Sequence, residues 1–409
     1  MSRSIGQGTI EPAGLRTKAG ANIGGANAHN RRVVMQGLRV NGTMTRAQIA
    51  RGSGLVPQTV SNIIEDLARE GLVVAAEPVR AGRGQPATPY SIAANGAFAL
   101  GLQIDQHHAR AVVVNLLGQI MVGTETVLQP GGLQANLPLI LAALDNVATA
   151  PGLLAVPAPH RILGLGVAMP APTGVHATHG DPWMVGLTEA HPIVEVLRRE
   201  TGLAVSLHHD ASAAAVAERV TGCAVGLDSF VLIFVSYGIG AGIYVGGELA
   251  RGHHRLAGEL GLVRVPDGTG MVALEDRASL KRLLASLGLM PNQPDLFAHL
   301  EAATRAAAPQ VIRWMAEAAH HLAWAIDMLQ CLLDPEAVVI GGQMPDILME
   351  GLFDAILKAQ ATTHFDRDAT YTRPIRGSVA PYSVAVGAAA DPIARAFDPS
   401  LSAMMKPPA

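Results

Sequence analysis

Four polar side chains near the start of one expected helix are of the types that read DNA bases. They are Gln58, Thr59, Ser61 and Asn62. Their amide and hydroxyl groups can hydrogen-bond base edges in a major groove, while the N-terminal end of the helix faces phosphate. We therefore predict that they contact DNA. The alternative is an ordinary helical hairpin on a larger domain, because helix pairs joined by glycine turns are common.

The stretch 45–71 supplies two amphipathic helices that would position these side chains. Gly52 and Gly54 give the turn between the helices a permissive backbone. Pro57 suits the first position of the second helix, where its missing N–H would have no partner. Apolar residues recur around the turn and at helical spacing beyond it, and we expect them to be buried: Ile49, Ala50, Leu55, Val60, Ile63, Ile64 and Leu67.

Flanking elements complete the pattern of a winged helix-turn-helix. Residues 27–40 predict a third helix that packs under the pair, and residues 72–76 and 90–92 predict two strands joined by a basic loop. The loop contains G-R-G-Q-P, whose glycines would let the backbone enter a narrow minor groove. Arg80 and Arg83 would meet the negative potential there. A flexible linker between domains is the other interpretation, and the two are compatible.

Length and composition place the chain among globular proteins. Of its 409 residues, 49% are hydrophobic and 15% charged, which suits two or three domains with apolar cores. No apolar run reaches the roughly 18 residues of a membrane-spanning helix, and the N-terminus lacks the apolar core of a secretory signal. Cys223 and Cys331 are the only cysteines. We therefore expect a protein of the reducing cytoplasm, with no disulfide framework and no membrane partner.

Charge is unevenly distributed along the chain. Residues 1–93 contain 11 Lys and Arg against 5 Asp and Glu, a net charge of +6. The remaining residues contain 19 against 28, a net charge of −9. A basic head on an acidic body is expected when only the head binds a polyanion, although a solvated basic tail would give the same asymmetry.

From Phe98 onward, expected strands and helices alternate, which indicates an α/β body. Expected strands cover 99–104, 109–114, 120–124, 162–168, 204–207, 229–236, 337–340 and 375–379. Expected helices cover 137–148, 192–201, 294–307, 309–333, 351–360 and 384–397.

Short motifs, each weak alone, occur in a specific order and spacing along residues 27–397. They are G-L-V-P-Q-T-V-S (54–61), G-R-G-Q-P (82–86), G-V-A-M-P (166–170), H-D-A-S-A-A-A (209–215), G-I-G-A-G-I (238–243), A-G-E-L-G (257–261), L-E (274–275) and D-P-E-A-V-V-I-G-G (334–342). Together they resemble the ROK family of sugar-responsive repressors and sugar kinases. The resemblance implies a two-lobed, actin-like ATPase fold with a sugar cleft between the lobes. Family members that carry a winged helix, as this chain does, resemble repressors of the xylose or N-acetylglucosamine type.

The resemblance also suggests how the chain divides into domains. We expect a flexible tail at 1–25, a winged helix-turn-helix domain with a basic wing at 26–93, a first lobe at 94–220 together with the C-terminal helix 384–398, and a second lobe at 221–383.

Departures from the family pattern argue against phosphoryl transfer. Kinase members carry a phosphate loop of the form D-x-G-G-T after the first strand, where glycines let the backbone approach ATP. In this chain Asp105 is followed by Gln-His-His-Ala, so the glycines and the threonine are missing. A later glycine-rich segment, interpreted as a loop at 238–242, could cradle phosphate or simply form a tight turn beside a ligand.

A second departure concerns the family's zinc site, which the resemblance places on one histidine and three cysteines. Leu262 stands at the histidine position, and residues 268–275 contain no cysteine. Leucine offers zinc no ligand. We predict neither a structural zinc nor another cofactor.

The resemblance implies five sugar-contacting positions, which carried over singly are His209, Asp210, Glu259, Leu262 and Glu275. Carboxylates suit sugars because each can accept two hydroxyl hydrogen bonds. Asp210 would be the base in a kinase and is interpreted here as a ligand anchor. The alternatives are a helix N-cap for Asp210 and surface charge for the two glutamates. The exchanges at positions 209 and 262 point to a ligand other than an ordinary aldohexose.

We therefore expect a cytoplasmic, sugar-responsive repressor that is not an enzyme. It would bind operator DNA as a homodimer or a tetramer and hold a sugar or polyol effector between its lobes. Trp183 could stack on a sugar face or belong to the core. One alternative function is an ATP-dependent sugar kinase with a fused DNA-binding head, and another is a DNA-binding scaffold that responds to no ligand.

Overall fold

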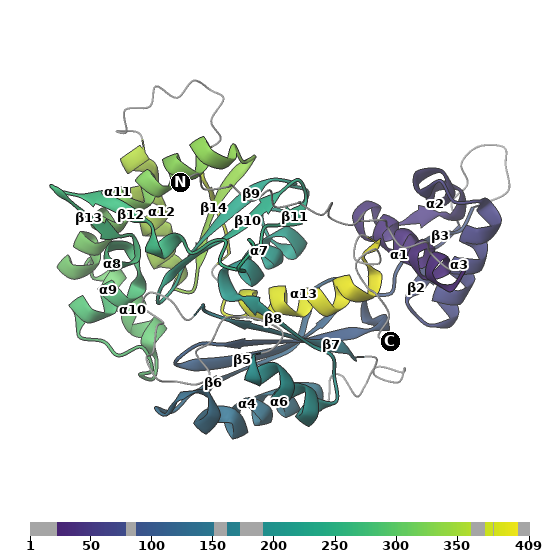
Figure 1. Ribbon diagram of the computed structural model, residues 1–409, viewed down its shortest axis with the longest axis horizontal. Coiled ribbons are helices and arrows are strands. Elements are labelled where there is room, and N and C mark those ends of the chain that lie inside the picture. The colour runs from purple at the N-terminus through teal and green to yellow at the C-terminus, as the bar shows by residue number, and fades with distance from the viewer. Residues whose placement is uncertain are drawn as a thin grey trace, which may run out of the picture.

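The computed structural model describes a small N-terminal head followed by two larger lobes (Figure 1). The described residues are 23–78, 87–150, 162–171, 191–360, 373–378 and 380–399. The predicted tail at 1–25 lies almost wholly outside them. Among the described helices, none is long and apolar enough to cross a membrane.

The head has the element order of a winged helix-turn-helix. Its helices are α1 (Ile23–Asn41), α2 (Arg46–Ser53) and α3 (Pro57–Arg69). Its antiparallel sheet has the order β1-β3-β2, formed by β1 (Met44–Thr45), β2 (Val73–Ala75) and β3 (Pro89–Ile92). The predicted helix pair, third helix and two strands are therefore all present.

Local sequence signals explain where the two helices of the pair begin and end. Thr45 and Gln48 form a capping box, in which each side chain accepts a hydrogen bond from the other residue's backbone N–H. Pro57 is the first residue of α3, as predicted. Gly54 follows α2 and adopts a φ of 70° in the turn. The prediction for Gly52 was wrong, because that residue lies inside α2.

Apolar spacing correctly predicted the buried face of α3. The side chains of Val60, Ile63, Ile64 and Leu67 are buried. They belong to one cluster with residues of α1 and α2, namely Val34, Met35, Leu38, Ile49 and Ala50.

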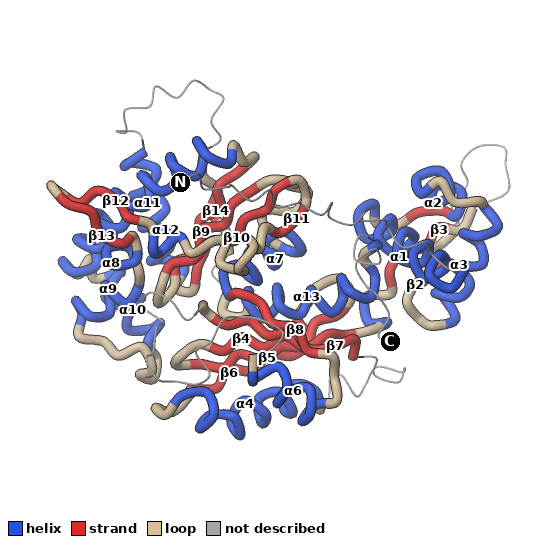
Figure 2. The backbone as a smooth tube through the Cα atoms, viewed as in Figure 1, coloured by secondary structure: helices blue, strands red, loops and turns tan. Residues whose placement is uncertain are grey.

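The first lobe is built on a five-stranded sheet in the order β6-β5-β4-β7-β8. The strands are β4 (Phe98–Ile104), β5 (His108–Asn115), β6 (Ile120–Val127), β7 (Ile162–Met169) and β8 (Val205–His209). Helices α4 (Gly132–Ala148) and α6 (Pro192–Thr201) lie on one face of the sheet, as Figure 2 shows. Helices α7 (Asp210–Thr221) and α13 (Ser383–Phe397) lie on the other.

The second lobe repeats this sheet order as β11-β10-β9-β14-β15. In both sheets the first three strands are antiparallel and the last three parallel. The strands are β9 (Phe230–Val235), β10 (Ile239–Val245), β11 (Glu248–Leu249), β14 (Ala337–Gly342) and β15 (Ile375–Arg376). The helices are α8 (Glu275–Ala278), α9 (Leu280–Leu287), α10 (Leu296–Arg305), α11 (Pro309–Leu333) and α12 (Asp346–Gln360). A hairpin of β12 (Arg264–Asp267) and β13 (Gly270–Ala273) completes the lobe.

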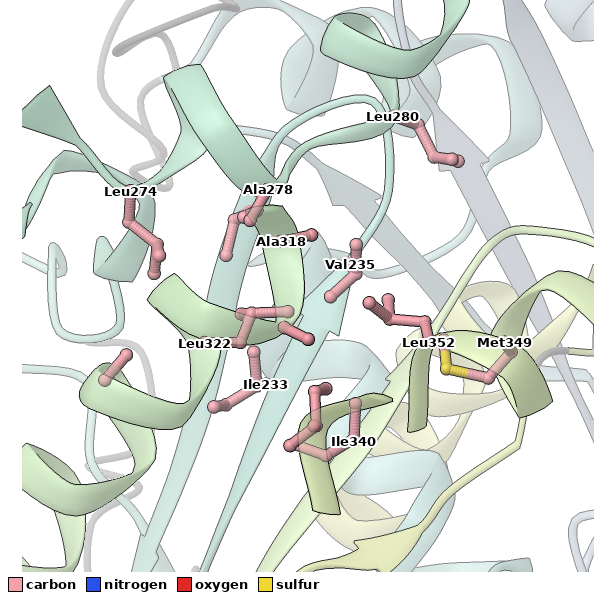
Figure 3. Close-up of a cluster of buried hydrophobic side chains, with 14 of the residues drawn as sticks. Ile233, Val235, Leu274, Ala278, Leu280, Ala318, Leu322, Ile340, Met349 and Leu352 are labelled. Atoms are coloured by element: carbon pink, nitrogen blue, oxygen red, sulfur yellow. The ribbon is translucent and has the colours of Figure 1, made fainter. Parts of the chain in front are cut away.

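Strand β9 is buried on both faces, and its side chains alternate between two apolar clusters. Ile233 and Val235 pack with α11 and α12 in the cluster of Figure 3. Phe230 and Phe234 point to the opposite side, where they pack with alanines of α7 and residues of α13. This double burial explains why the sequence of β9 is continuously apolar rather than alternating.

Helices α7 and α13 pack very closely against each other between the two sheets. Gly387 of α13 makes this approach possible, because a Cβ atom there would lie 1.7 Å from the carbonyl oxygen of Ala213 in α7. Gly101 in β4 and Gly166 in β7 approach the backbone of α13 in the same way. Glycines thus connect α13 tightly to both α7 and the first sheet.

Three predicted helix starts were too late, and the first is that of α1, which begins at Ile23 rather than 27. Helix α4 begins at Gly132 rather than 137, because the Asn136 side chain donates to the carbonyls of Gln129 and Gly132 and stabilises an extra turn. Helix α12 begins at Asp346 rather than 351. The predicted domain boundaries stay predictions.

The predicted glycine loop at 238–242 was also wrong, because Ile239 to Gly242 belong to strand β10. Its glycines allow helix packing: a Cβ atom on Gly240 would lie 2.7 Å from the Ala211 side chain, and one on Gly242 would lie 2.3 Å from that of Ala215. Both alanines belong to α7. The close contact with this helix explains the glycines without any phosphate.

Candidate functional site

The head presents the predicted DNA-contacting residues on one helix. Gln58 and Asn62 are exposed, and the Gln58 amide donates a 2.9 Å hydrogen bond to Oδ1 of Asn62. Thr59 and Ser61 are half-buried. This hydrogen bond holds the two amides side by side near the N-terminal end of α3. Of the remaining predicted contacts, Arg80 and Arg83 lie outside the described residues.

Three of the predicted cleft residues come together where β8 passes into α7. The Nε2 atom of His209 lies 3.3 Å from Oδ1 of Asp210 and 3.6 Å from Oε1 of Glu259. All three side chains are mostly buried, with exposed fractions of 12%, 11% and 19%. An imidazole between two carboxylates can carry a proton toward either of them, and the group offers a dense set of partners for hydroxyls.

Glu275 is buried, at 6% exposure, and lies close to the segment that follows Glu259. A Cβ atom placed on Gly261 would lie 2.9 Å from one Glu275 carboxylate oxygen. Gly261 belongs to a short 3-10 helix, Leu260–Leu262, that directly follows Glu259. The surface-charge interpretation of the two glutamates was therefore wrong, since both side chains are largely or fully buried.

Asp210 is the first residue of α7, and the backbone N–H of Ala211 donates to its Oδ1 at 2.6 Å. The N-cap position itself is occupied by His209. The alternative of a side-chain N-cap for Asp210 therefore does not hold.

The turn after β4 is closed by the carboxylate of Asp105. Backbone N–H groups of His107 and His108 each donate to its Oδ1 at 2.7 Å, and Arg110 donates to its Oδ2 at 3.2 Å. Burial would raise the pKa of this carboxyl, but the hydrogen bond with His108 and the charges of Arg110 and His108 outweigh it and hold the pKa below its usual value. Side chains therefore fill the turn at the position where kinases need glycine backbone close to the phosphates of ATP.

One pocket joins this turn to Asp210 and to the second lobe. Its polar lining comprises Gln103, Asp105, Gln106, His107, His108, Arg110, Asp210, Ser236, Tyr237 and Gln343. Its apolar lining comprises Leu280, Leu284, Pro291, Leu296, Phe297 and Leu300. The other predicted ligand residues, His209, Glu259 and Glu275, lie outside this lining, and His209 contacts Asp210 within it.

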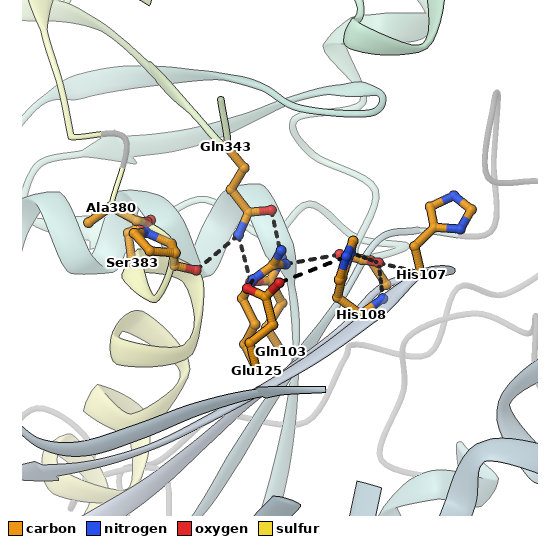
Figure 4. Close-up of polar contacts among 10 residues, drawn as sticks. Gln103, His107, His108, Glu125, Gln343, Ala380 and Ser383 are labelled. Atoms are coloured by element: carbon orange, nitrogen blue, oxygen red, sulfur yellow. Dashed lines mark hydrogen bonds and ion pairs between the residues drawn. The ribbon is translucent and has the colours of Figure 1, made fainter. Parts of the chain in front are cut away.

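Two contacts cross between the lobes beside this pocket. Gln103 of β4 and Gln343, just after β14, exchange amide hydrogen bonds of 3.0 and 2.7 Å (Figure 4). The ring of His107 meets the ring of Tyr237 edge to face, with centroids 5.1 Å apart. These contacts join the end of β4 to the segments that follow β14 and β9.

Sequence reasoning missed Gln103, Arg110 and the apolar wall of the pocket. A usable signal existed for Gln103 and Arg110, since each is the single polar residue in its expected strand, 99–104 or 109–114. Both side chains are nevertheless buried, so each needs a partner. For the apolar wall no such signal exists, because leucines at helical spacing predict any buried helix face.

The zinc site that the resemblance implies does not fit the residues at this position. Leu262 is an apolar side chain with 41% exposure, and the β12–β13 hairpin after it contains no cysteine. Cys223 lies just after α7, and Cys331 lies near the end of α11. This donor set offers zinc no tetrahedral site at the hairpin. The absence of zinc remains a prediction from the sequence.

Two relatives match most of the chain. An uncharacterized protein, y4fQ of Sinorhizobium fredii, is 25% identical over 391 residues, covering 90% of this chain and 91% of the relative. A putative xylose repressor of Caldicellulosiruptor sp. is 22% identical over 363 residues, covering 82% of this chain and 89% of the relative.

Solved structures and a family model agree with these relatives. A ROK family transcriptional regulator, a homologue of the Escherichia coli MLC protein, has a TM-score of 0.68 at 20% identity, covering 93% of this chain and 98% of its own. A ROK family glucokinase from Streptomyces griseus, in complex with glucose and AMPPNP, has a TM-score of 0.57 at 22% identity, covering 72% of this chain and 98% of its own. The family model described as ROK family matches residues 157–390, more than half of the chain. The chain therefore belongs to the ROK family.

Proposed function

We propose that this protein is a cytoplasmic, sugar-responsive transcriptional regulator, acting as a repressor. The head would bind operator DNA through α3, and a sugar or polyol would bind at His209, Asp210, Glu259 and Glu275. The observation that carries the proposal is the presence, in one chain, of an exposed polar helix face on the head and a cluster of mostly buried carboxylates in the body.

A continuous packed path joins the two sites. Asp210 begins α7, and α7 packs closely on α13 at Gly387. At the far end of α13, the side chain of Arg32 in α1 donates a 3.2 Å hydrogen bond to the carbonyl oxygen of Ala396. A ligand that shifts α7 would therefore move the surface on which the head rests. Such a shift would change DNA affinity only if the ligand binds one arrangement of the lobes better than the other.

The turn at Asp105 favours a non-catalytic body over the kinase alternative. Two backbone N–H groups of this turn, those of His107 and His108, already donate to the Asp105 carboxylate. Arg110 is likewise engaged, by Asp105 at 3.2 Å and by Glu125 at 2.8 Å. Phosphoryl transfer depends on donors that are positioned for the nucleotide, and these donors are already used.

Fluorescence anisotropy with a labelled duplex from the region upstream of the protein's own operon tests the proposal. We expect salt-sensitive binding that unlabelled duplex of the same sequence displaces far better than unrelated duplex. Addition of the effector, sought among hexoses, pentoses and polyols, should change the affinity at least fivefold. Asp210→Asn should abolish the response to the sugar and leave DNA binding intact, since the amide oxygen can still accept from Ala211.

Asp145→Asn is a matched control on the exposed face of α4, and it should leave both properties unchanged. Absence of any sequence-specific DNA binding would refute the regulator. ATP-dependent phosphorylation of a sugar in a coupled assay would favour the kinase alternative. Specific DNA binding with no response to any ligand would favour the unresponsive scaffold.

The proposal includes a symmetric oligomer, a homodimer or a tetramer. A dimer would place two α3 helices in half-sites about one helical turn apart, so the operator should be palindromic. Sedimentation equilibrium with and without the palindromic duplex measures the stoichiometry. One protein chain per duplex would rule out this part of the proposal.

A further inference from the structure

We propose that the effector is a glycoside with a flat apolar aglycone, whose sugar binds at Asp210 while its aglycone enters the pocket beside it. The proposal rests on the proposed function, because it assigns the chemical class of the ligand at the same cleft. The walls of this pocket are polar on one side and apolar on the other.

The polar wall is formed by residues of the first lobe and by residues that follow β9 and β14 in the second lobe. It includes Asp210, and that residue also contacts His209 of the carboxylate cluster. A sugar bound at the cluster would therefore have one edge at the mouth of the pocket. Ser236 and Tyr237 add hydroxyl groups on the second lobe.

The apolar wall is formed by α9, α10 and the segment between them. Leu284 and Leu300 are buried members of the second lobe's core. Phe297 differs from them, because it is half-buried and, within the described residues, does not belong to that core cluster. Together with Tyr237 it supplies aromatic surface to the pocket. A flat apolar group is the natural occupant, since aromatic rings stack on such surfaces and gain from leaving water.

The charges of the pocket disfavour a nucleotide there. Arg110 is the only arginine or lysine in the lining, all of which is described, and two carboxylates already pair with it. Asp105 and Asp210 add negative charge to the same lining. A triphosphate would bring several further negative charges next to these groups, which costs free energy in a partly buried site. An uncharged ligand avoids this repulsion, and its glycosidic oxygen can still accept a hydrogen bond.

Isothermal titration calorimetry on the full-length protein tests the proposal with matched pairs of ligands. Methyl and phenyl glycosides of glucose, xylose, galactose and N-acetylglucosamine, in both anomeric forms, are the probes. For at least one sugar we expect the phenyl glycoside to bind at least tenfold more tightly than the methyl glycoside, a difference of about 1.4 kcal/mol. Phe297→Ala should bring this ratio toward one. Ile312→Ala, at an exposed apolar position of α11, should leave it unchanged.

The outcomes separate this inference from the proposed function. Binding of methyl glycosides with equal or weaker binding of their phenyl partners overturns the aglycone and leaves the sugar effector standing. A phenyl preference that survives Phe297→Ala also overturns it. If no glycoside of either kind binds, the sugar effector fails together with the aglycone. Binding of ATP more tightly than of any phenyl glycoside would overturn the charge argument.

Discussion

Gln103 and Gln343, which are 240 residues apart in the chain, form a reciprocal amide pair that links the two lobes (Figure 4). Each side chain donates to the other, at 3.0 and 2.7 Å, and Gln343 also donates to the carbonyl oxygen of Pro381 at 3.4 Å. Both side chains are buried. Both residues line the same pocket as Asp105 and Asp210. The pair therefore joins the lobes at the place where a ligand in the pocket would move the lobes apart or together.

We predict that the two amides stabilise the fold as a unit. Gln103→Ala or Gln343→Ala should each lower the free energy of unfolding by about 1–3 kcal/mol, because the remaining amide is buried without its partner. The double variant should lose about 1–2 kcal/mol less than the sum of the single losses. Urea unfolding followed by circular dichroism gives all four free energies.

Gln134→Ala, on the exposed face of α4, is the matched control and should change stability by less than about 0.5 kcal/mol. Strictly additive losses from Gln103→Ala and Gln343→Ala would show that the two side chains do not act as a pair.

Asp105 should give stability a defined dependence on pH. The pKa of Asp105 in the folded protein is lowered from the ordinary value of 3.8. Its contribution to the free energy of unfolding is therefore complete above about pH 4 and declines as pH falls toward the folded pKa. Asp105→Asn should cost about 1–3 kcal/mol at pH 7, because the amide keeps the oxygen facing His107 and His108 but turns an NH2 group toward Arg110. Urea unfolding should give a smaller difference between variant and wild type at pH 3.5 than at pH 5. A difference at pH 3.5 that equals or exceeds the one at pH 5 would contradict this assignment.

We predict opposite effects on stability when alanine replaces Gly387, in the close contact of α7 and α13, and when it replaces Gly37 in α1. Gly387→Ala should destabilise the protein by about 3 kcal/mol, because its Cβ would lie 1.7 Å from the carbonyl oxygen of Ala213. Gly37→Ala, in α1, should stabilise it by about 0.5–1 kcal/mol, because it lies in a helix and a Cβ atom there would meet nothing within 4 Å. Thermal unfolding of both variants measures these shifts. Equal effects of the two exchanges would show that backbone entropy, and not the close contact, dominates at Gly387.

Elements whose signals are local could be predicted from the sequence. The helix at Pro192–Thr201 was predicted with its observed bounds, because Pro192 marks its start and Gly202, with φ at 68°, marks its end. The buried face of α3 followed from apolar spacing in the same way. Asp210, Glu259 and Glu275 were found through the family resemblance, and the structure places them in or beside one cluster.

Features that depend on distant partners could not be predicted. The glycines of β10 were interpreted as a loop that could cradle phosphate or form a tight turn. Their observed role depends on another element, since alanines of α7 pack on Gly240 and Gly242. Gln103 was passed over because its partner follows a strand of the other lobe. The apolar wall beside Phe297 has no local signature either, since only the fold brings α9 and α10 to the end of β4.

The last prediction concerns how the head recognises DNA. Gln58→Ala should relax base preference within the half-site, because it removes an exposed amide that lies beside Asn62 and can face base edges. Asn62→Ala should have a related effect, because it also frees the Gln58 amide from its 2.9 Å hydrogen bond. Arg83→Ala should instead weaken binding mainly at A/T-rich flanks, as expected for a side chain in a narrow minor groove. Selection from a randomised operator library, followed by anisotropy on the chosen duplexes, measures both effects, with Gln134→Ala as the control. If the Gln58 and Arg83 variants lose affinity equally on all sequences, the division between base reading by α3 and groove contact by the basic loop is wrong.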